Sequence, residues 1–594
     1  MSGIPVLPAT ENSAPRRSSR EEVLAALADL RGQASRWAAS GITERATLAG
    51  LLRREVGHAA PRWVEVSSRI KGLEPSDERT AEEWLAGPYC VLRFLRLVEI
   101  ALGAYAAGRR APFVAEPRRL ASGHLAVRVM PSDHFDKLLL RGMTVDVWLR
   151  PGIDPADVFG RRNATDEAQV ALVLGAGNVS SIPALDVLDQ ILLHGRVVLL
   201  KMNPVNAALG AVLGEALAPL VDSRLLRIVH GGAELGAQLC ADPGIDAVHV
   251  TGSDATYEAI VFGTGEEGAR RKAARQPLRT KPVTGELGNV GPVIVVPGPW
   301  SAADVAWQGR AIAAQVVNNA GCNCNAARVI VQHAGWPGRE HVLLAIAEAL
   351  AGIPPRVAWY PGMARRFSAF AATHPEARRL GTPAPDALPW LLIDGLDPLA
   401  ADEMCFRTEA FCGVVGETGI VASDAEGFLE RAVEFANRRL WGSLSACIVV
   451  HPATLGEPAM AAALDRAIAG LEFGTIGINV WPAAGYAFGA PPWGAFPGAV
   501  PWDIQSGTGF VHNAALLNGI EKAVVRAPFR PLPVPPWIPG ARHPLAVARA
   551  MTEFELQPGW RALVRVLVAA VAGVTAPDLE GTEAGQSGRP DRDY

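Results

Sequence analysis

The stretch "QVALVLGAG" at 169–177, followed by "IPALDVLDQILLHG" at 182–195 and "RVVLLKMNP" at 196–204, decides the fold of this chain. Two short apolar runs, each ending in a turn, flank an apolar segment that is long enough for a helix. A strand, a helix and a second strand in this order make a crossover that places two parallel strands in one sheet. The sequence therefore predicts a parallel sheet covered by helices.

The same alternation continues toward the C-terminus. Strands are predicted at 225–231 and 245–253, with helices at 206–221 and 234–242. A second series adds strands at 292–296, 327–332, 390–395 and 413–420, and helices at 303–317 and 340–350. Repeated alternation of this kind predicts an α/β fold with two doubly wound domains.

The flanking regions have different patterns. Segments 21–30, 44–56 and 90–108 carry apolar residues at three- and four-residue intervals, which predicts helices. "HLAVRV" at 124–129 and "TVDVWLR" at 144–150 alternate at period two, which predicts strands. The apolar run at 560–574 is short and contains two arginines, so we expect a packed helix and no membrane span.

Composition bounds the function classes. The chain has 594 residues, of which 49% are hydrophobic and 20% charged, and a formal net charge of −4, so charge offers no case for binding nucleic acid or an anionic membrane. Its seven cysteines are odd in number and mostly scattered, unlike a secreted disulfide framework. The first twenty residues lack the apolar core of a signal peptide. We expect a cytoplasmic protein.

Polar residues follow several of the predicted strands. Lys201, one of only six lysines, ends a strand, where open α/β sheets bind ligands. The turn Thr251-Gly252-Ser253 starts a helix; it is either a simple N-cap or an anion site. Glu286 stands among glycines before a buried strand, as a loop residue or as a general base. Ser180 occupies the third glycine position of a standard dinucleotide fingerprint, so that motif is not met.

Two cysteines lie one residue apart in "NNAGCNC" at 318–324. A metal site would need further ligands, and His333 is the one histidine nearby. A disulfide between residues two apart would be strained. A nucleophilic cysteine and an inert buried one both remain open from the residues alone.

In their order and spacing, these fragments resemble the aldehyde dehydrogenase superfamily. "TGELGN" at 284–289 is similar to that family's glutamate motif, "NAGCNC" at 319–324 to its N-x-G-Q-x-C motif, and "TEAFCGVV" at 408–415 to its E-x-F-G-P-V motif. "GTIGINVWP" at 474–482 and "AFGAPPWG" at 487–494 resemble its closing segments. The resemblance covers roughly residues 120 to 530.

The resemblance implies NAD(P)-dependent oxidation of a small-molecule aldehyde to a carboxylic acid through a cysteine thiohemiacetal and thioester, with no metal. It implies that Cys324 is the nucleophile, that Asn178 and the Cys324 backbone stabilise the oxyanion, and that Glu286 activates water. The residues implied to bind NAD or NADP are Lys201 and Glu409 at the ribose hydroxyls, Gly252 and Ser253 at the pyrophosphate, and Phe411 at the nicotinamide.

Departures from the family pattern keep alternatives open. "LGAGN" at 174–178 looks closer to acyl-CoA reductases, which suggests coenzyme A as an acyl acceptor or acyl donor. Glu286 favours hydrolysis instead. Pro204 stands where NAD-preferring members often carry glutamate, so NADP is expected to bind as well. A catalytically silent member acting as a binding protein is a further alternative, which the full set of motif residues disfavours.

The patterns also divide the chain. We expect a disordered N-terminus at 1–19, followed by a helical N-terminal part of the cofactor domain at 20–123. A β-strand oligomerisation element is expected at 124–150, joined by about 519–530, then an NAD(P)-binding domain at 151–286 and a catalytic domain at 287–474. The chain is expected to return to the cofactor domain and form a C-terminal helical extension at 475–579, and to end in a flexible tail at 580–594. Strands that project from a domain leave unpaired edges, so we expect a homodimer or homotetramer.

Overall fold

A five-stranded parallel sheet positions one half of the site. The computed structural model describes residues 16–159 and 167–572. Strands β4 (Val170–Leu174), β5 (Val197–Met202), β6 (Leu226–His230), β7 (Ala247–Gly252) and β8 (Val283–Leu287) lie in the order β6-β5-β4-β7-β8. The direction of winding reverses between β4 and β7, and open α/β sheets bind ligands at the carboxyl ends of the strands at such a point.

The helices of this sheet lie close to their predicted positions. They are α6 (Ile182–Leu188), which continues into a π-helical turn (Asp189–Leu193), α7 (Leu209–Ala216), α8 (Ala218–Asp222), α9 (Ala233–Ala241), α10 (Asp254–Phe262) and α11 (Gly265–Ala273). The prediction of one helix over 206–221 is wrong, because α7 ends before α8 begins. Pro219 has no N–H to donate to the carbonyl of residue 215, which ends the first helix.

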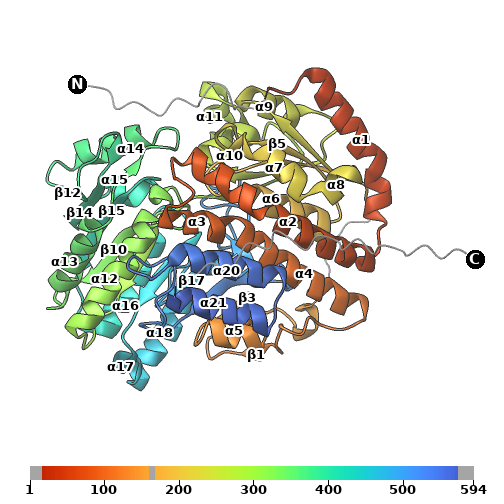
Figure 1. Ribbon diagram of the computed structural model, residues 1–594. Helices are drawn as coiled ribbons and strands as arrows, with labels where there is room; N and C mark the ends of the chain where they lie inside the picture. The colour runs from red at the N-terminus through yellow and green to blue at the C-terminus, as the bar shows by residue number, and fades with distance from the viewer. Residues whose placement is uncertain (1–15, 160–166, 573–594) are drawn as a thin grey trace, which may run out of the picture.

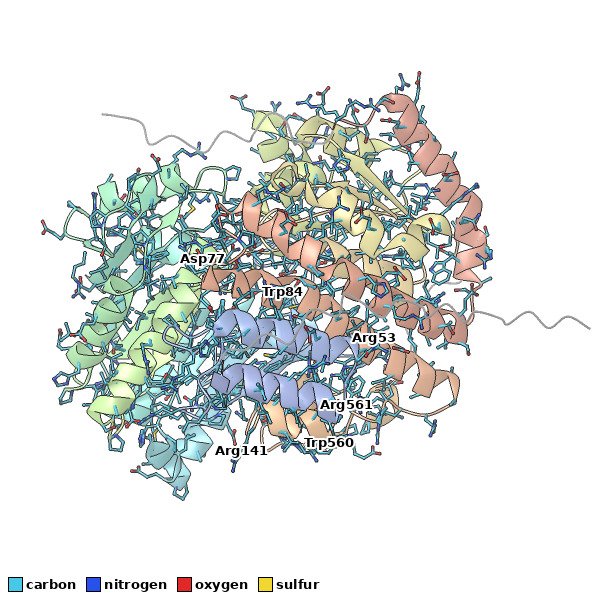
Figure 2. All side chains as sticks on the ribbon, viewed as in Figure 1. Arg53, Asp77, Trp84, Arg141, Trp560 and Arg561 are labelled. Carbon is cyan, nitrogen blue, oxygen red and sulfur yellow. The ribbon has the colours of Figure 1, made fainter. Side chains whose placement is uncertain are left out.

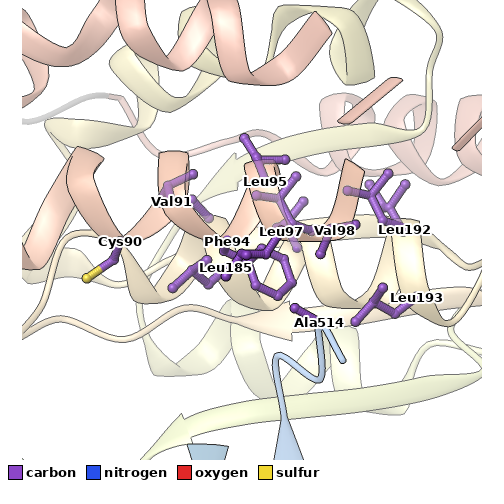
Figure 3. Packing of buried hydrophobic residues seen from close by; sticks show 14 of the residues in the cluster. Cys90, Val91, Phe94, Leu95, Leu97, Val98, Leu185, Leu192, Leu193 and Ala514 are labelled. Atoms are coloured by element: carbon purple, nitrogen blue, oxygen red, sulfur yellow. The ribbon is translucent and has the colours of Figure 1, made fainter. Parts of the chain in front are cut away.

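Helices α1 (Arg20–Ala38), α2 (Ile42–Ile70) and α4 (Cys90–Ala106) share a core with this sheet. Figure 3 shows Phe94 and Val98 of α4 packed with Leu185 and Leu192. Continuous apolar contact of this kind makes the N-terminal helices part of the same hydrophobic core.

The expectation of disorder over 1–19 is wrong for its last residues. Ser19 caps α1 in a capping box with Glu22, and the Ser18 amide donates to the His230 carbonyl. Residues 1–15 and the tail expected at 580–594 lie outside the described residues.

An eleven-stranded sheet positions the other half of the site (Figure 1). Its order is β1 (Arg118–Arg119), β2 (Leu125–Met130), β3 (Thr144–Leu149), β20 (Ile520–Arg526), β17 (Thr475–Ile478), β16 (Ser445–Val449), β9 (Gly291–Val295), β10 (Ala327–His333), β15 (Val414–Ile420), β14 (Trp390–Leu396) and β12 (Arg378–Leu380). The strands from β20 to β14 are parallel. Its larger helices are α12 (Ala302–Val317), α13 (Arg339–Ala351), α14 (Met363–Thr373), α16 (Ala425–Arg439) and α18 (Pro458–Gly470).

The hairpin β2–β3 is joined by β20, as the sequence predicts for residues 519–530. Strand β20 joins β3 antiparallel on one side and β17 parallel on the other, within one chain. Val524, for example, lies opposite both Asp146 and Ile476. On its other side, β2 pairs with the two-residue strand β1 at Leu125 and Ala126, and β1 is the last described strand at this end, so the sheet ends in a strand edge here.

The C-terminal extension forms two helices, α20 (Pro544–Leu556) and α21 (Trp560–Ala572), which lie in front of the N-terminal helices in Figure 1. Helix α21 packs as predicted, since Leu563 and Val566 are buried. Its opposite face is exposed, and Figure 2 labels Trp560 and Arg561 at one end of it. Within the described residues, no helix combines the length and apolar character needed to cross a membrane.

Candidate active site

One cleft collects every residue that the sequence singled out. Its volume is about 1080 Å³. It is lined, among others, by Asn178, Lys201, Gly252, Ser253, Glu286, Cys324, Glu409 and Phe411. These residues are up to 233 positions apart in the chain, between Asn178 and Phe411, and the cleft brings them together where the two sheets face each other.

The turn before Cys324 has an unusual backbone. Asn319, Ala320 and Gly321 have φ of 53°, 57° and 77°, which is the left-handed region that residues with a Cβ rarely adopt. The Asn319 amide stabilises the turn, because its Nδ2 donates to the Asn178 carbonyl at 2.9 Å and to Asn323 Oδ1 at 3.0 Å. A side chain at Gly321 would place its Cβ 2.5 Å from the Cys412 backbone, so only glycine fits there. The turn thus directs residue 324 into the cleft.

The two sulfurs have different environments. Cys322 is fully buried, with Sγ 3.8 Å from Met363 Sδ and 3.5 Å from the Phe411 carbonyl, and burial raises the pKa of its thiol to about 12. Cys324 is half-buried and lines the cleft, with Sγ 3.9 Å from Glu286 Oε1. Burial, followed by the charges of Glu286 and Glu409, raises the pKa of the Cys324 thiol. Cys324 is therefore a neutral thiol with a carboxylate in position to accept its proton.

Glu286, near the end of β8, has the properties of a general base. Its Oε1 accepts a hydrogen bond from Trp493 Nε1 at 2.7 Å, and its buried Oε2 has no partner among the described residues. Burial, with the Asp186 charge as the second cause, raises the pKa of this carboxyl to about 7, and the Trp493 hydrogen bond opposes that rise. A base with a pKa near the working pH is effective in proton transfer.

A buried polar network lies behind Glu286. Asp186 Oδ2 accepts from the Thr251 hydroxyl at 2.9 Å, and Oδ1 lies 3.0 Å from His512 Nε2 and 3.6 Å from His249 Nε2. Although burial opposes ionisation, the two histidines hold the pKa of the Asp186 carboxyl below its usual range. This keeps a negative charge near Glu286. Sequence reasoning selected none of these four residues as a site residue, although Trp493 lies within the segment at 487–494 that resembles a family motif.

Two unpartnered polar side chains face the cleft from opposite walls. Lys201 at the end of β5 is 7% exposed, its Nζ has no hydrogen-bond partner within the described part of the chain, and burial lowers its pKa. Glu409 Oε1 is buried without a described partner. Burial raises the pKa of the Glu409 carboxyl to about 7, against the charge of Arg328. Buried polar atoms ordinarily have partners, so a donor and an acceptor left open here fit a polyhydroxyl ligand such as a ribose.

Ser253 is the N-cap of α10, since its Oγ accepts from the Thr256 amide at 3.2 Å. The capping interpretation is thus confirmed, and an anion can still approach the first N–H groups of the helix from the cleft.

Phe411, with a left-handed φ of 45°, presents a ring that contacts Tyr360 edge-on at 5.1 Å between centroids. Asn178 Nδ2 donates one hydrogen to the Cys322 carbonyl at 2.9 Å, which leaves its second N–H for another acceptor.

Arg279 also lines the cleft, and sequence reasoning did not select it. Its Nε is buried and unpartnered among the described residues, and Lys201 and Pro204 line the same cleft. One arginine among many carries no signal in the sequence. Its place in the cleft makes it a candidate for a second anionic group.

A narrow cavity of about 120 Å³ reaches Cys324 and Glu286 from the side opposite the cleft. Its wall includes the aromatic residues Trp481, Trp493, Trp537, Tyr486 and Phe488. The thiol therefore stands between a large polar cleft and a narrow apolar cavity.

Comparisons with known proteins agree with this geometry. The model of the aldehyde dehydrogenase family matches residues 176–352, a range that includes Asn178, Lys201, Glu286 and Cys324. The N-succinylglutamate 5-semialdehyde dehydrogenase of Sphingopyxis alaskensis is 34% identical over 143 residues, which are 24% of this chain and 27% of that protein. The match thus spans only about a quarter of the curated relative.

Solved structures share the fold. A putative aldehyde dehydrogenase from Burkholderia cenocepacia has a TM-score of 0.59 at 18% identity, covering 87% of this chain and 94% of that one. An NADP-dependent glyceraldehyde-3-phosphate dehydrogenase from Bacillus halodurans, complexed with NADP, has a TM-score of 0.57 at 18% identity, covering 85% and 91%. An NAD-dependent aldehyde dehydrogenase from Sinorhizobium meliloti has 0.56 at 18%, covering 87% and 89%. The chain thus carries a segment at 176–352 that matches the aldehyde dehydrogenase family, and it shares the fold of solved aldehyde dehydrogenases.

Proposed function

We propose that the protein oxidises an aldehyde to a carboxylic acid with NAD or NADP as hydride acceptor. The observation that carries the proposal is the pair Cys324 and Glu286, with Sγ 3.9 Å from Oε1, between a cleft that fits a dinucleotide and a cavity that fits an apolar chain. The relatives named as NAD- or NADP-dependent support the choice of cofactor.

The reaction begins with proton transfer. Glu286 accepts the proton of the Cys324 thiol and passes it to solvent, and the thiolate attacks the carbonyl carbon of the aldehyde. The carbonyl oxygen becomes an oxyanion, for which the Cys324 amide and the free N–H of Asn178 are donors. The bound nicotinamide cofactor supplies the hydride acceptor, and a thioester on Cys324 results.

The second half of the reaction uses Glu286 again. Its unpartnered Oε2 accepts a proton from water as that water attacks the thioester carbon. The C–S bond breaks, Cys324 regains a proton, and the carboxylic acid leaves. A buried glutamate with a pKa of about 7 is suited to this step, which favours hydrolysis over transfer to coenzyme A.

We assign cofactor binding to the region 151–286 and catalysis to the region 287–474. Lys201 and Glu409 would hold ribose hydroxyls, Gly252 and Ser253 the pyrophosphate, and Phe411 the nicotinamide ring. Pro204 offers no charge against a 2′-phosphate, and Arg279 offers a cation for it. We therefore expect both cofactors to bind, with at most a modest preference for NAD.

A panel of aldehydes with NAD and NADP, each with and without coenzyme A, tests the proposal by the appearance of reduced cofactor. Turnover without coenzyme A supports the hydrolytic reaction. Turnover that requires coenzyme A assigns the protein to the acylating relatives, and no turnover with any aldehyde refutes the proposal.

A homodimer or larger assembly remains part of the proposal, and helix α21 offers a second surface for it besides the strand edge at β1–β2. The exposed face of α21 carries Trp560, Val564, Leu567, Val568 and Val571, which are 45% to 77% exposed. The chain beyond residue 572 has few large apolar residues that could cover this face, and a net charge of −4 disfavours a membrane. We commit to a second copy of the chain as its partner, with the two α21 faces packed together about a two-fold axis.

A further inference from the structure

The aromatic side chains that line the cavity beside Cys324 offer an apolar surface, because the polar atoms of three of them are bonded to other protein atoms. The buried Asn319 Oδ1 and Asn325 Oδ1 of the same wall have no described partner, and both are acceptors. Trp481 Nε1 donates to the Asn325 carbonyl at 2.7 Å, and Trp493 Nε1 donates to Glu286. The Tyr486 hydroxyl lies 2.8 Å from Ser181 Oγ. Rings whose polar atoms are occupied present their apolar surface to whatever enters.

The charged residues of the cavity wall leave no place for an anion. Lys71 is the one cation that lines it among the described residues, and its Nζ is paired with Glu83 Oε1 at 2.6 Å, with both side chains buried. Glu82 is paired with Arg356 at 3.1 Å. Glu83 Oε2 is buried and has no described partner, so the open polar atom at this end is an acceptor. A ligand carboxylate in the cavity would lie near the Glu83 carboxylate and would find no unpaired cation among the lining residues. Burying an unpaired charge costs free energy, so such a ligand is disfavoured.

Part of the wall is built by segments that lie outside the resemblance to the family. Leu85 and Tyr89 come from a π-helical turn (Leu85–Tyr89) between α3 (Ala81–Trp84) and α4. Trp537 comes from the segment after β20, and Met551 from α20. The N-terminal helices and the C-terminal extension thus close the cavity and set its chemistry.

We propose that the substrates are neutral aldehydes with an extended apolar or aromatic chain, and that acidic semialdehydes are excluded. The inference rests on the proposed function, because it takes the cavity as the path of the aldehyde chain to Cys324. It also separates this protein from its curated relative, which is named for a semialdehyde that carries carboxylates.

Values of kcat/KM for propanal, butanal, hexanal, phenylacetaldehyde and succinic semialdehyde test the proposal. A buried methylene contributes about 0.8 kcal/mol, a factor of about four, so hexanal should exceed propanal by roughly 60-fold. Succinic semialdehyde should fall below butanal by about 100-fold or more. Equal values for propanal and hexanal, or a preference for succinic semialdehyde, would overturn the proposal.

Ala487→Trp tests the location of the chain, because Ala487 lines the cavity. It should lower kcat/KM for hexanal at least about tenfold and leave propanal within about twofold. Val421→Trp, at a position 70% exposed and outside the cavity, is the matched control and should change neither. Unchanged hexanal oxidation in Ala487→Trp, with cofactor binding intact, would overturn the assignment.

Calorimetry with unreactive amides separates this inference from the proposed function. Hexanamide should bind the wild-type chain about 60-fold more tightly than propanamide, succinamate should not bind, and Ala487→Trp should lose the hexanamide advantage. If no aldehyde is turned over, the proposed function fails while hexanamide binding still supports an apolar ligand site. Hexanamide binding no tighter than propanamide refutes the inference even if turnover is seen.

Discussion

Removing the indole donor of Trp493 should move the pH dependence of thioester hydrolysis. Trp493 and Glu286 are 1% and 2% exposed, and Nε1 donates to Oε1 at 2.7 Å. This hydrogen bond favours the ionised carboxylate, whose pKa is about 7 with the bond in place. A hydrogen bond to a charged group contributes about 1.5 to 3 kcal/mol, and 1.36 kcal/mol corresponds to one pKa unit. Trp493→Phe should therefore raise the pKa of Glu286 by about one to two units.

The consequence is a loss of base at neutral pH. The ionised fraction of Glu286 at pH 7 should fall from about one half to between about 1% and 10%, so hydrolysis slows roughly five- to fiftyfold. The rate should recover as the pH rises, because the carboxylate forms again. The assay is the pH dependence of kcat under conditions where the steady state follows a burst, so that hydrolysis limits turnover.

Trp481→Phe is the matched control. Trp481 lines the same cavity and donates an equally short hydrogen bond, at 2.7 Å, but to the Asn325 carbonyl. Trp481→Phe should leave the pKa of the acidic limb in the pH profile of kcat unchanged from the wild type. An unshifted limb in Trp493→Phe, or equal shifts in both variants, would refute the reasoning.

Four further predictions follow from the site and the surface. Cys324→Ser should abolish turnover and retain cofactor binding, whereas Cys322→Ser should keep substantial activity; the reverse result in steady-state assays would mean that the motif is misaligned by two residues. Glu286→Gln should release one equivalent of reduced cofactor and then stall, and this first turnover should be slower than in the wild type because the Cys324 thiol must lose its proton without the carboxylate. Because the folded pKa of about 7 exceeds the ordinary value of 4.5 for a glutamate carboxyl, the stability associated with this carboxyl is present below about pH 4.5 and lost as the pH rises through 7. Glu286→Gln should thus gain about 3 kcal/mol of unfolding free energy near pH 8.5 and nothing near pH 4, and denaturant unfolding at both pH values checks this. Arg279→Ala should weaken NADP binding at least about tenfold and NAD binding less than about twofold by calorimetry; equal losses would place the guanidinium away from the 2′-phosphate. Light scattering at micromolar concentration should give a multiple of the 62.7 kDa chain mass for the wild type and the single mass for Leu567→Glu; a monomeric wild type contradicts the assembly.

The sequence by itself determined most strands of the two sheets and the segments that carry the chemistry, although it did not predict β8, which holds Glu286, or β16. Alternation between short apolar runs and helical segments is a local property, so the βαβ unit at 169–204 could be predicted from residue spacing. The order of the motifs was sufficient to choose Cys324 over Cys322 as the candidate nucleophile. The single helix predicted over 206–221 was wrong, because Pro219 divides this segment into two helices.

Only the tertiary structure decided what surrounds those residues. Trp493 lies 207 positions after Glu286 in the sequence and donates a hydrogen bond to its carboxylate. Lys71 forms an ion pair with Glu83 in the wall of a cavity that is also lined by residues after 530. The pairing of β20 with β17 within one chain likewise has no local signature. Hydrophobic periodicity indicates which side of a helix or strand is buried. The pKa of Glu286, the charge of the cavity and the pairing of a strand edge depend instead on which distant segments pack against each of them.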